Sequence, residues 1–191
     1  MRLFVALQIP DSIRNDYAAL IDELRRLDVK AAPKKPKWVR PENLHVTLKF
    51  IGNTEPTKLN SIRDALATVR SPQRIQLHFR NIGFFPNGNR PRVIWGGMEA
   101  SENLAPLANA VDQQIATLGF PAEERAFTPH LTLARLDPPA IAPELRSAIE
   151  RHVARDFGEL HTSEFHLIES KLKPTGAEYT TLQSFSFVSN G

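Results

Sequence analysis

Leu44-His45-Val46-Thr47-Leu48-Lys49-Phe50 is the stretch that decides the fold of this chain. Its apolar residues alternate with polar ones, and a period of two is typical of a strand with one buried and one open face. His45, Thr47 and Lys49 should therefore share the open face. The pattern recurs later in the chain as His130-Leu131-Thr132-Leu133. This recurrence indicates a duplicated half-site rather than an ordinary sheet surface.

The His-x-Thr spacing sets an imidazole beside a hydroxyl, because residues i and i+2 of a strand project from one face roughly 7 Å apart. Near neutral pH an imidazole acts as acid or base, and hydroxyls donate hydrogen bonds to anionic oxygens. If two such strands face each other, the combined groups suit cleavage of a phosphodiester by water without a metal. The remaining histidines lack the motif and are expected to be structural: His78, His152, His161 and His166.

The composition is that of an ordinary globular protein, with 41% hydrophobic and 24% charged residues in a chain of 191. Zero cysteines exclude disulfide bridges, cysteine zinc sites and thiol nucleophiles, and they fit a reducing compartment. No apolar run reaches the length of a signal peptide or of a membrane-spanning helix. We therefore expect a cytoplasmic protein with no membrane partner.

Helix and strand patterns alternate along the chain, which predicts an α+β fold. Strand patterns cover residues 2–8, 44–50, 75–79, 92–95, 130–136, 164–172 and 179–188. Helix patterns cover residues 11–27, 54–69, 103–118 and 145–153. One unit is used nearly twice and no linker separates the copies, so residues 1–191 are expected to form a single domain of two intertwined lobes. Each lobe should contain an antiparallel-type sheet flanked by helices.

A basic segment precedes the first motif and contains Lys30, Lys34, Lys35, Lys37 and Arg40, interrupted by Pro33, Pro36 and Trp38. The chain has a net charge of only +3, so the clustering of charge matters more than its total. Cations beside an aromatic ring suit an RNA backbone with a stacked base. Basic runs are also common as solvated linkers, and the sequence leaves both interpretations open.

Other catalytic constellations are missing from the sequence. It contains no Gly-rich phosphate loop, no His-Glu-x-x-His helix and no Gly-x-Ser-x-Gly elbow. A two-histidine metal site would need nearby carboxylates, and neither motif strand carries one. We therefore expect a site that uses neither a metal nor another cofactor.

Both motifs and their neighbouring residues resemble those of the two-histidine phosphoesterase superfamily, and most closely its RNA 2′,3′-cyclic phosphodiesterases, also called 2′-5′ RNA ligases. The resemblance covers nearly the whole chain and rests on residues 1–7, 44–52, 92–96, 127–135 and 170–179. It implies a bilobal, pseudo-twofold fold in which the motifs line a central cleft. It also implies hydrolysis of RNA or nucleoside 2′,3′-cyclic phosphate to a 2′-phosphomonoester. Some relatives also join or cleave 2′-5′ RNA linkages.

The resemblance further implies roles for individual residues. His45 and His130 form the acid-base pair, while Thr47 and Thr132 bind the phosphate. Water must attack opposite the departing 3′-oxygen, so one histidine deprotonates water and the other protonates that oxygen. We expect His45 to be the acid and His130 to be the base, although the sequence itself does not decide this.

Arg135 and Phe127 complete the implied site, as a phosphate ligand and a contact to the base. Strict alternation places Arg135 on the face opposite to the histidine and threonine of its own motif. The strand must therefore twist or bulge there, or the side chain must reach round its end. Lys49 is expected to be a rim residue or a contact to a backbone phosphate rather than a catalytic group, because the second motif has Ala134 in the same phase.

Two alternatives to hydrolysis of an RNA or nucleotide with a 2′,3′-cyclic phosphate end stay open. One is a non-catalytic RNA-binding module that uses the basic segment around Trp38. The other is a phosphodiesterase of the same superfamily that acts on a small cyclic nucleotide or a 2′-5′ oligonucleotide. We expect a monomer, because the duplication already supplies both halves of the site.

Overall fold

The computed structural model of the chain describes residues 1–27, 35–86, 90–174 and 176–188. The strands in these ranges are β1 (Arg2–Gln8), β2 (Lys37–Trp38), β3 (His45–Asn53), β4 (Ile75–Phe85), β5 (Val93–Ala100), β6 (Leu131–Arg135), β7 (Asp156–Thr162), β8 (Glu164–Lys173) and β9 (Gly176–Ser186). The α-helices are α1 (Asp11–Leu27), α2 (Leu59–Leu66), α3 (Leu104–Ala116) and α4 (Pro143–Arg151). Short 3₁₀ turns, η1 (Pro41–Asn43) and η2 (Pro56–Lys58), precede β3 and α2. The predicted α+β class is confirmed.

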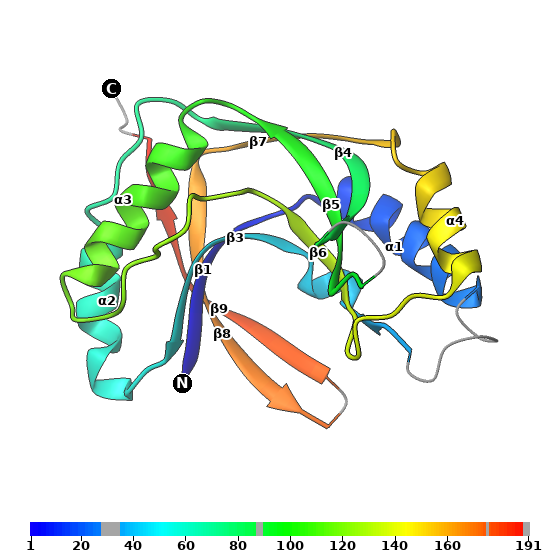
Figure 1. Ribbon diagram of the computed structural model, residues 1–191. Coiled ribbons are helices and arrows are strands. Elements are labelled where there is room, and N and C mark those ends of the chain that lie inside the picture. Colours follow the sequence, from blue (N-terminus) through cyan, green and yellow to red (C-terminus); the bar gives the residue numbers. More distant parts are fainter. Residues whose placement is uncertain (28–34, 87–89, 175, 189–191) are drawn as a thin grey trace.

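The strands form one curled antiparallel sheet in the order β7-β4-β5-β6-β3-β1-β8-β9, with β2 added beside β6 (Figure 1). The two expected sheets are halves of this sheet. They are joined where β3 meets β6 through the pair Val46 and Leu131. The two motif strands are thus neighbours at the centre of the sheet.

The two halves exchange a strand. β4 follows α2 in the chain, but it pairs with β5, whereas β8 from the end of the chain pairs with β1. Each half of the sheet therefore contains strands from both halves of the sequence. This exchange gives the intertwined lobes that the repeated order of elements predicted.

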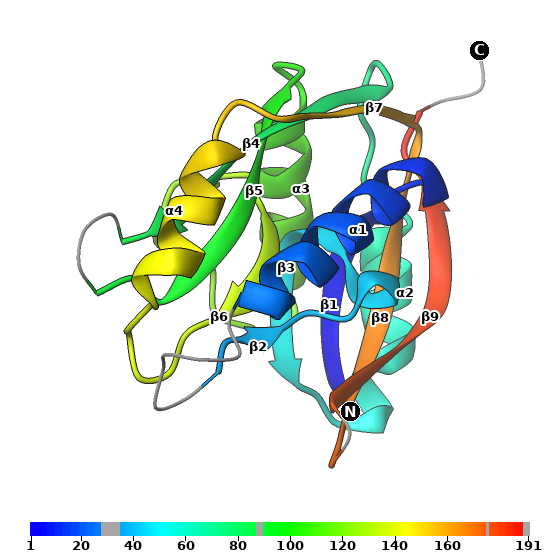
Figure 2. The same cartoon turned by 90° about the vertical axis from the view of Figure 1, so that its right-hand side faces the viewer.

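Helices cover the sheet as two pairs, with α2 and α3 at one end and α1 and α4 at the other (Figures 1 and 2). Tyr17 of α1 stacks on Phe157 of β7, with 3.9 Å between ring centroids. A Cβ atom at Gly96 of β5 would lie 2.5 Å from the Tyr17 hydroxyl, so glycine is required for this close approach. Apolar side chains of both helix pairs and of one sheet face form the main core.

The structure differs from the sequence prediction near the fourth helix. Helix α4 ends at Arg151, and Val153, which was expected on its apolar face, is 55% exposed. β7 was missed because only Phe157 is buried among its seven residues. An edge strand with so few buried residues shows little apolar alternation. β4 and β5 are each longer than predicted.

The basic segment is partly a strand. Lys37 and Trp38 form β2 and pair with Arg135 and Ala134 of β6. Lys30, Pro33 and Lys34 lie outside the described residues, as do residues 87–89 of the expected turn at 86–89. In the described ranges, no helix is long and apolar enough to cross a membrane.

Candidate active site

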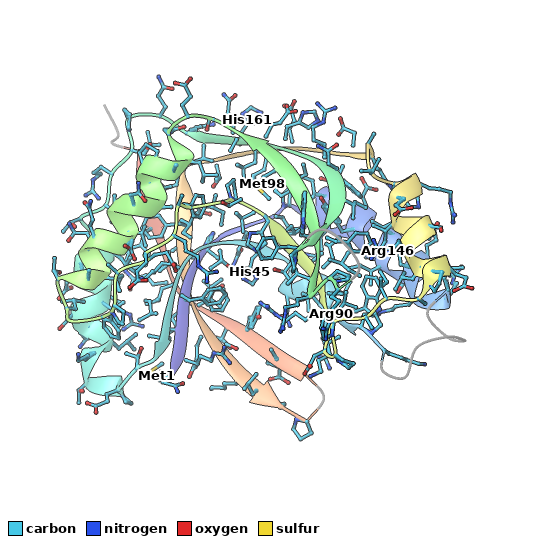
Figure 3. All side chains as sticks on the ribbon, in the orientation of Figure 1. Met1, His45, Arg90, Met98, Arg146 and His161 are labelled. Atoms are coloured by element: carbon cyan, nitrogen blue, oxygen red, sulfur yellow. The ribbon has the colours of Figure 1, made fainter. Side chains whose placement is uncertain are left out.

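The two His-x-Thr motifs lie side by side on one face of the sheet. Val46 and Leu131 are paired and buried in the main core. Since side chains alternate across a strand, the residues that flank this pair project from the opposite, open face. They are the histidine and threonine of each motif, His45 and Thr47 in β3, and Thr132 in β6 with His130 directly before that strand. Figure 3 shows His45 near the middle of the arch formed by the sheet.

Both imidazoles are oriented by the same hydrogen bond. Nδ1 of His45 lies 2.7 Å from the carbonyl oxygen of Asn43, and Nδ1 of His130 lies 2.9 Å from that of Thr128. A carbonyl oxygen only accepts, so Nδ1 donates and carries the proton in each ring. Nε2 is therefore the nitrogen that can take or give a proton in both histidines.

His45 has an apolar environment. Its ring centroid lies 4.7 Å from that of Phe4 and 5.4 Å from that of Tyr179. Burial lowers the pKa of His45, and the positive charges of His130 and Arg135 lower it further, whereas the hydrogen bond to Asn43 acts in the opposite direction. The neutral imidazole is thus favoured in the free protein.

Each motif strand contains a β-bulge directly after its threonine. In β3, Thr47 pairs with Ala6 but Lys49 pairs with Val5, which leaves Leu48 as an extra residue. The bulge shifts the alternation by one position. Lys49 therefore turns inward and is 6% exposed, whereas Phe50 turns to the open face and is 59% exposed.

The same shift occurs in β6. Thr132 pairs with Trp95 but Ala134 pairs with Ile94, which leaves Leu133 as the extra residue. Leu133 and Ala134 are both fully buried, and Arg135 is exposed. The bulge removes the conflict between Arg135 and strict alternation, because it returns this residue to the face of Thr132.

The positive charge of Arg135 influences the titration of two groups in the candidate site. Its positive charge acts on His45 and also on Tyr179, whose pKa is raised by burial and lowered by Arg135 and Arg2. Lys37 of β2 is its direct cross-strand neighbour. Two cations therefore flank the open face at the end of β6.

Lys49 is not at the rim, contrary to the sequence prediction. Its ammonium group forms a buried ion pair with Asp112 of α3 and donates a hydrogen bond of 2.7 Å to the carbonyl oxygen of Pro121. Asp112 also accepts from the backbone N–H of Glu123. Lys49 thus fastens β3 to α3 and to the segment that leads to His130. Lys49 points inward because of the bulge at Leu48, and the alternation of residues along β3 alone does not reveal a bulge.

Comparisons with known proteins identify the family. The model of the 2′-5′ RNA ligase superfamily matches residues 9–173. The chain belongs to this superfamily. It is 37% identical over 186 residues to a protein of Archaeoglobus fulgidus, covering 97% of this chain and 99% of the relative, and 33% identical over 185 residues to one of Methanocaldococcus jannaschii, covering 97% and 100%. Both relatives are named RNA 2′,3′-cyclic phosphodiesterase.

Solved structures of the superfamily fold agree with this membership. A Thermus thermophilus protein superposes with a TM-score of 0.79 at 30% identity, over all of both chains. E. coli LigT, in a structure with 3′-AMP, superposes with a TM-score of 0.76 at 25% identity, over 98% of both chains. The family resemblance and the fold that the motifs implied are therefore confirmed.

Trp95 also lies on the open face, and the sequence analysis did not predict it as a site residue. It is the cross-strand partner of Thr132 and half-buried. A Cβ atom at Gly83 or at Gly97 would lie 2.7 Å from the indole ring, so the ring lies flat over these two glycines on the open face. The signal in the sequence was the presence of glycines within apolar strand patterns, Gly83 in β4 and Gly97 in β5, because a glycine inside a strand often marks a close approach by another group.

The predicted base contact, Phe127, is half-buried and packs against the main core. The aromatic rings that contact His45 belong to Phe4 and Tyr179, and the Phe50 ring lies 6.0 Å from that of Phe4 between centroids. A small cavity of about 160 Å³ also borders His45, with Gln8 and Tyr179 among its lining residues. In the described part of the chain, no three His, Cys, Asp or Glu side chains form a metal-ligating group.

Proposed function

We propose that this chain hydrolyses the 2′,3′-cyclic phosphate end of RNA or of a nucleotide to a 2′-phosphomonoester, with His45 and His130 as the acid-base pair. One observation carries the proposal: two imidazoles with the same Nδ1 hydrogen bond share an open face with two threonine hydroxyls. Neither hydroxyl has a hydrogen-bond partner among the described residues. The names of the full-length relatives support the same reaction.

The reaction needs one proton to be removed and one to be delivered. Nε2 of one histidine takes a proton from water as its oxygen attacks phosphorus. The bond from phosphorus to the 3′-oxygen breaks, and Nε2 of the other histidine gives its proton to that oxygen. Thr47, Thr132 and Arg135 donate hydrogen bonds to the non-bridging oxygens, whose negative charge they stabilise.

We assign the acid role to His45 and the base role to His130. The lowered pKa of His45 holds it neutral in the free protein, so an acid role requires that substrate binding reverse this effect. A bound phosphate provides the reversal, because a nearby anion raises the pKa of an imidazole. Substrate binding therefore favours the protonated form of His45 that the acid role needs.

Ligation of 2′-5′ RNA linkages is the second candidate, favoured by the description of the superfamily. It is the same chemistry with the 5′-hydroxyl of a second RNA in place of water. A role toward a small cyclic nucleotide or a 2′-5′ oligonucleotide uses the same residues. The structure of LigT with 3′-AMP supports a nucleotide ligand for this fold. We further propose that residues 1–191 act as one bilobal domain and as a cytoplasmic monomer, since one chain supplies both motifs.

The test is to incubate the protein with cytidine 2′,3′-cyclic phosphate, and with an RNA that ends in the same group, in buffer containing a metal chelator. Phosphorus NMR identifies the position of the phosphate in the product. We expect a 2′-phosphomonoester from both substrates. A 3′-phosphate product would contradict the assignment of the leaving oxygen, and loss of turnover in chelator would restore the metal alternative. RNA binding without turnover would favour the non-catalytic module.

A further inference from the structure

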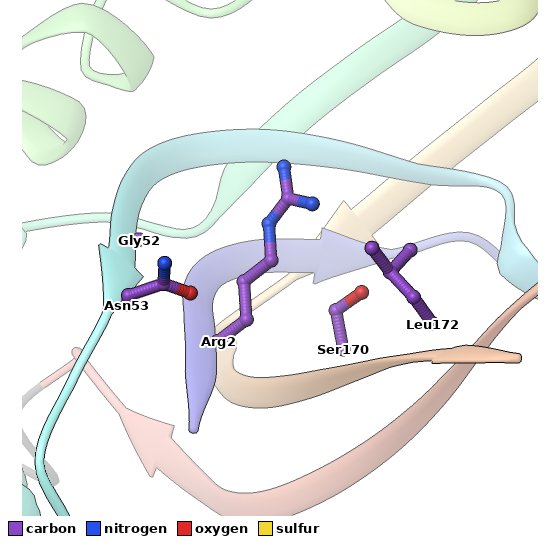
Figure 4. A pocket seen from close by; sticks show the side chains of 5 residues that line it. All are labelled: Arg2, Gly52, Asn53, Ser170 and Leu172. Atoms are coloured by element: carbon purple, nitrogen blue, oxygen red, sulfur yellow. The ribbon is translucent and has the colours of Figure 1, made fainter.

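A second hollow opens on the open face of the sheet, where the N-terminal end of β1 lies beside the ends of β3 and β8 (Figure 4). Its volume is about 510 Å³. The lining residues are Arg2, Gly52, Asn53, Ser170 and Leu172. They offer a cation, an amide, a hydroxyl and an apolar side chain, and none of them is acidic. Such a lining suits an anionic ligand that also has apolar parts.

The hollow lies on the same face of the sheet as the candidate active site. Arg2 and Phe4 are two positions apart in β1, so both project from the same face. Phe4 in turn contacts the His45 ring, and its centroid lies 5.0 Å from that of Tyr179. Tyr179 is the direct cross-strand partner of Ser170. Phe4 and Tyr179 therefore form a row of aromatic rings between His45 and the hollow.

Arg2 lines the hollow without a counterion from the described part of the chain. Its guanidinium makes no hydrogen bond or ion pair with any described residue. The positive charges of Arg2 and Arg135 both act on the phenol of Tyr179. This aromatic ring is thus within electrostatic reach of one arginine at each end of the open face.

The distance along β1 argues against a single phosphate that contacts both the histidines and Arg2. Ala6 pairs with Thr47, and Arg2 lies four residues before Ala6 in the same strand. At the rise of a β-strand this separation is about 13 Å. A ligand that uses both places must carry a second anionic group.

We propose that Arg2, Asn53 and Ser170 bind a backbone phosphate of the RNA strand upstream of the cyclic phosphate. The nucleotides between the two phosphates lie over the exposed side chains of Phe50 and Leu172, which are 59% and 72% exposed. The inference rests on the proposed function. It makes an oligonucleotide, rather than a mononucleotide, the preferred substrate.

The test compares cytidine 2′,3′-cyclic phosphate with an RNA tetranucleotide that ends in the same group. Arg2→Gln should lower the ratio of kcat/KM for the tetranucleotide to kcat/KM for the mononucleotide about tenfold, as expected for the loss of one charged hydrogen-bonding group. Lys171→Gln is the matched control. Lys171 is exposed, adjacent to Ser170 on the opposite face of β8, and paired with Glu169. This variant should keep the wild-type ratio.

Two further measurements separate phosphate binding from a structural role of Arg2. The slope of log kcat/KM for the tetranucleotide against log salt should become shallower by about 0.7 in Arg2→Gln, because one phosphate contact to a single strand is lost. Ser170→Asp retains Arg2 and adds a negative charge, so it should also lower the ratio. An unchanged ratio and slope in both variants would overturn the proposal.

Failure of the proposed function is visible separately, as wild-type protein that turns over neither substrate. In that case the tetranucleotide with a 2′-phosphate end serves as the probe in fluorescence anisotropy. A Kd about tenfold weaker in Arg2→Gln than in wild type or Lys171→Gln would support the phosphate pocket. Equal Kd values in all three proteins would overturn it.

Discussion

The two motif strands, β3 and β6, have the same backbone arrangement but present different side chains beyond it. Each histidine donates from Nδ1 to the carbonyl oxygen two residues earlier, and each threonine is followed by a β-bulge. After the bulge, β3 continues with Lys49 and Phe50, whereas β6 continues with Ala134 and Arg135. The cross-strand partner of the threonine is Ala6 in one half and Trp95 in the other.

Because of these differences, the two halves of the open face have different chemical character. In the β3 half, Phe4, Phe50 and Tyr179 form an aromatic surface that desolvates His45. In the β6 half, Arg135 and Lys37 supply positive charge. Duplication of the backbone explains why one chain holds two equivalent imidazoles. The asymmetric side chains explain how those imidazoles acquire different surroundings, as an acid and a base require.

Removing either imidazole should produce the largest effect. His45→Ala and His130→Ala should each lower kcat for cytidine 2′,3′-cyclic phosphate by about 10²–10⁴-fold, because each deletes one proton-transfer group. Steady-state kinetics measures the loss. His161→Ala, on β7 at the outer edge of the sheet (Figure 3), is the control and should retain wild-type turnover. Near-normal turnover in either single variant would contradict the two-histidine mechanism.

The buried ion pair of Lys49 has no counterpart in β6, where Ala134 stands at the same position. Loss of this pair should lower the free energy of unfolding without removing a proton-transfer group. Asp112→Asn leaves the Lys49 ammonium buried beside a neutral partner and should lower the free energy of unfolding by about 3 kcal/mol. Urea denaturation measures this change. Glu159→Gln, whose carboxylate pairs with His161 in an exposed position, should cost less than about 1 kcal/mol. An equal decrease in the free energy of unfolding in both variants would contradict burial of the ion pair between Lys49 and Asp112.

The charge at the end of β6 should matter more for binding than for proton transfer. Arg135→Gln should lower kcat/KM roughly tenfold, since one charged donor to the phosphate is lost. Steady-state kinetics at several pH values should find a pH profile of the wild-type shape. Its one expected change is a rise in the pKa of His45, because the Arg135 charge lowers that pKa in wild type. Arg70→Gln is the matched control, because it removes an exposed arginine whose hydrogen bonds go to the carbonyl oxygens of Ala67 and Val69, just after α2. A similar loss in Arg70→Gln would assign the effect to general charge instead.

The burial of His45 predicts the smallest effect, a loss of stability in acid. Burial lowers the pKa of His45 and also that of His166 below the ordinary value of 6.5, so the unfolded chain binds more protons in the window below that value. Stability is therefore complete above about pH 6.5 and falls as pH decreases through the folded-state pKa values. Urea denaturation between pH 5 and 7.5 tests this, and His45→Gln should lose less stability across the range than wild type. An equal loss would locate the acid sensitivity elsewhere.

The sequence alone determined much of the fold and the centre of the candidate site. Periodicity gave the bounds of β1 and the start of α1, and it placed the other helices and most strands. The paired motifs identified His45, Thr47, His130 and Thr132, and the structure brings all four to one face. Such features are local, because the face of a residue follows from its position along its own strand or helix.

Tertiary structure decided the rest. The bulges at Leu48 and Leu133 turn Lys49 inward and bring Phe50 and Arg135 to the open face. A bulge is a relation between two paired strands, so counting along either strand alone cannot reveal it. Long-range pairing also decides the exchange of β4 and β8 between the halves of the sheet. It likewise decides the position of the Trp95 ring, which lies over glycines of two strands. Local alternation thus determined which face the two His-x-Thr pairs share, and the contacts between strands determined what surrounds them.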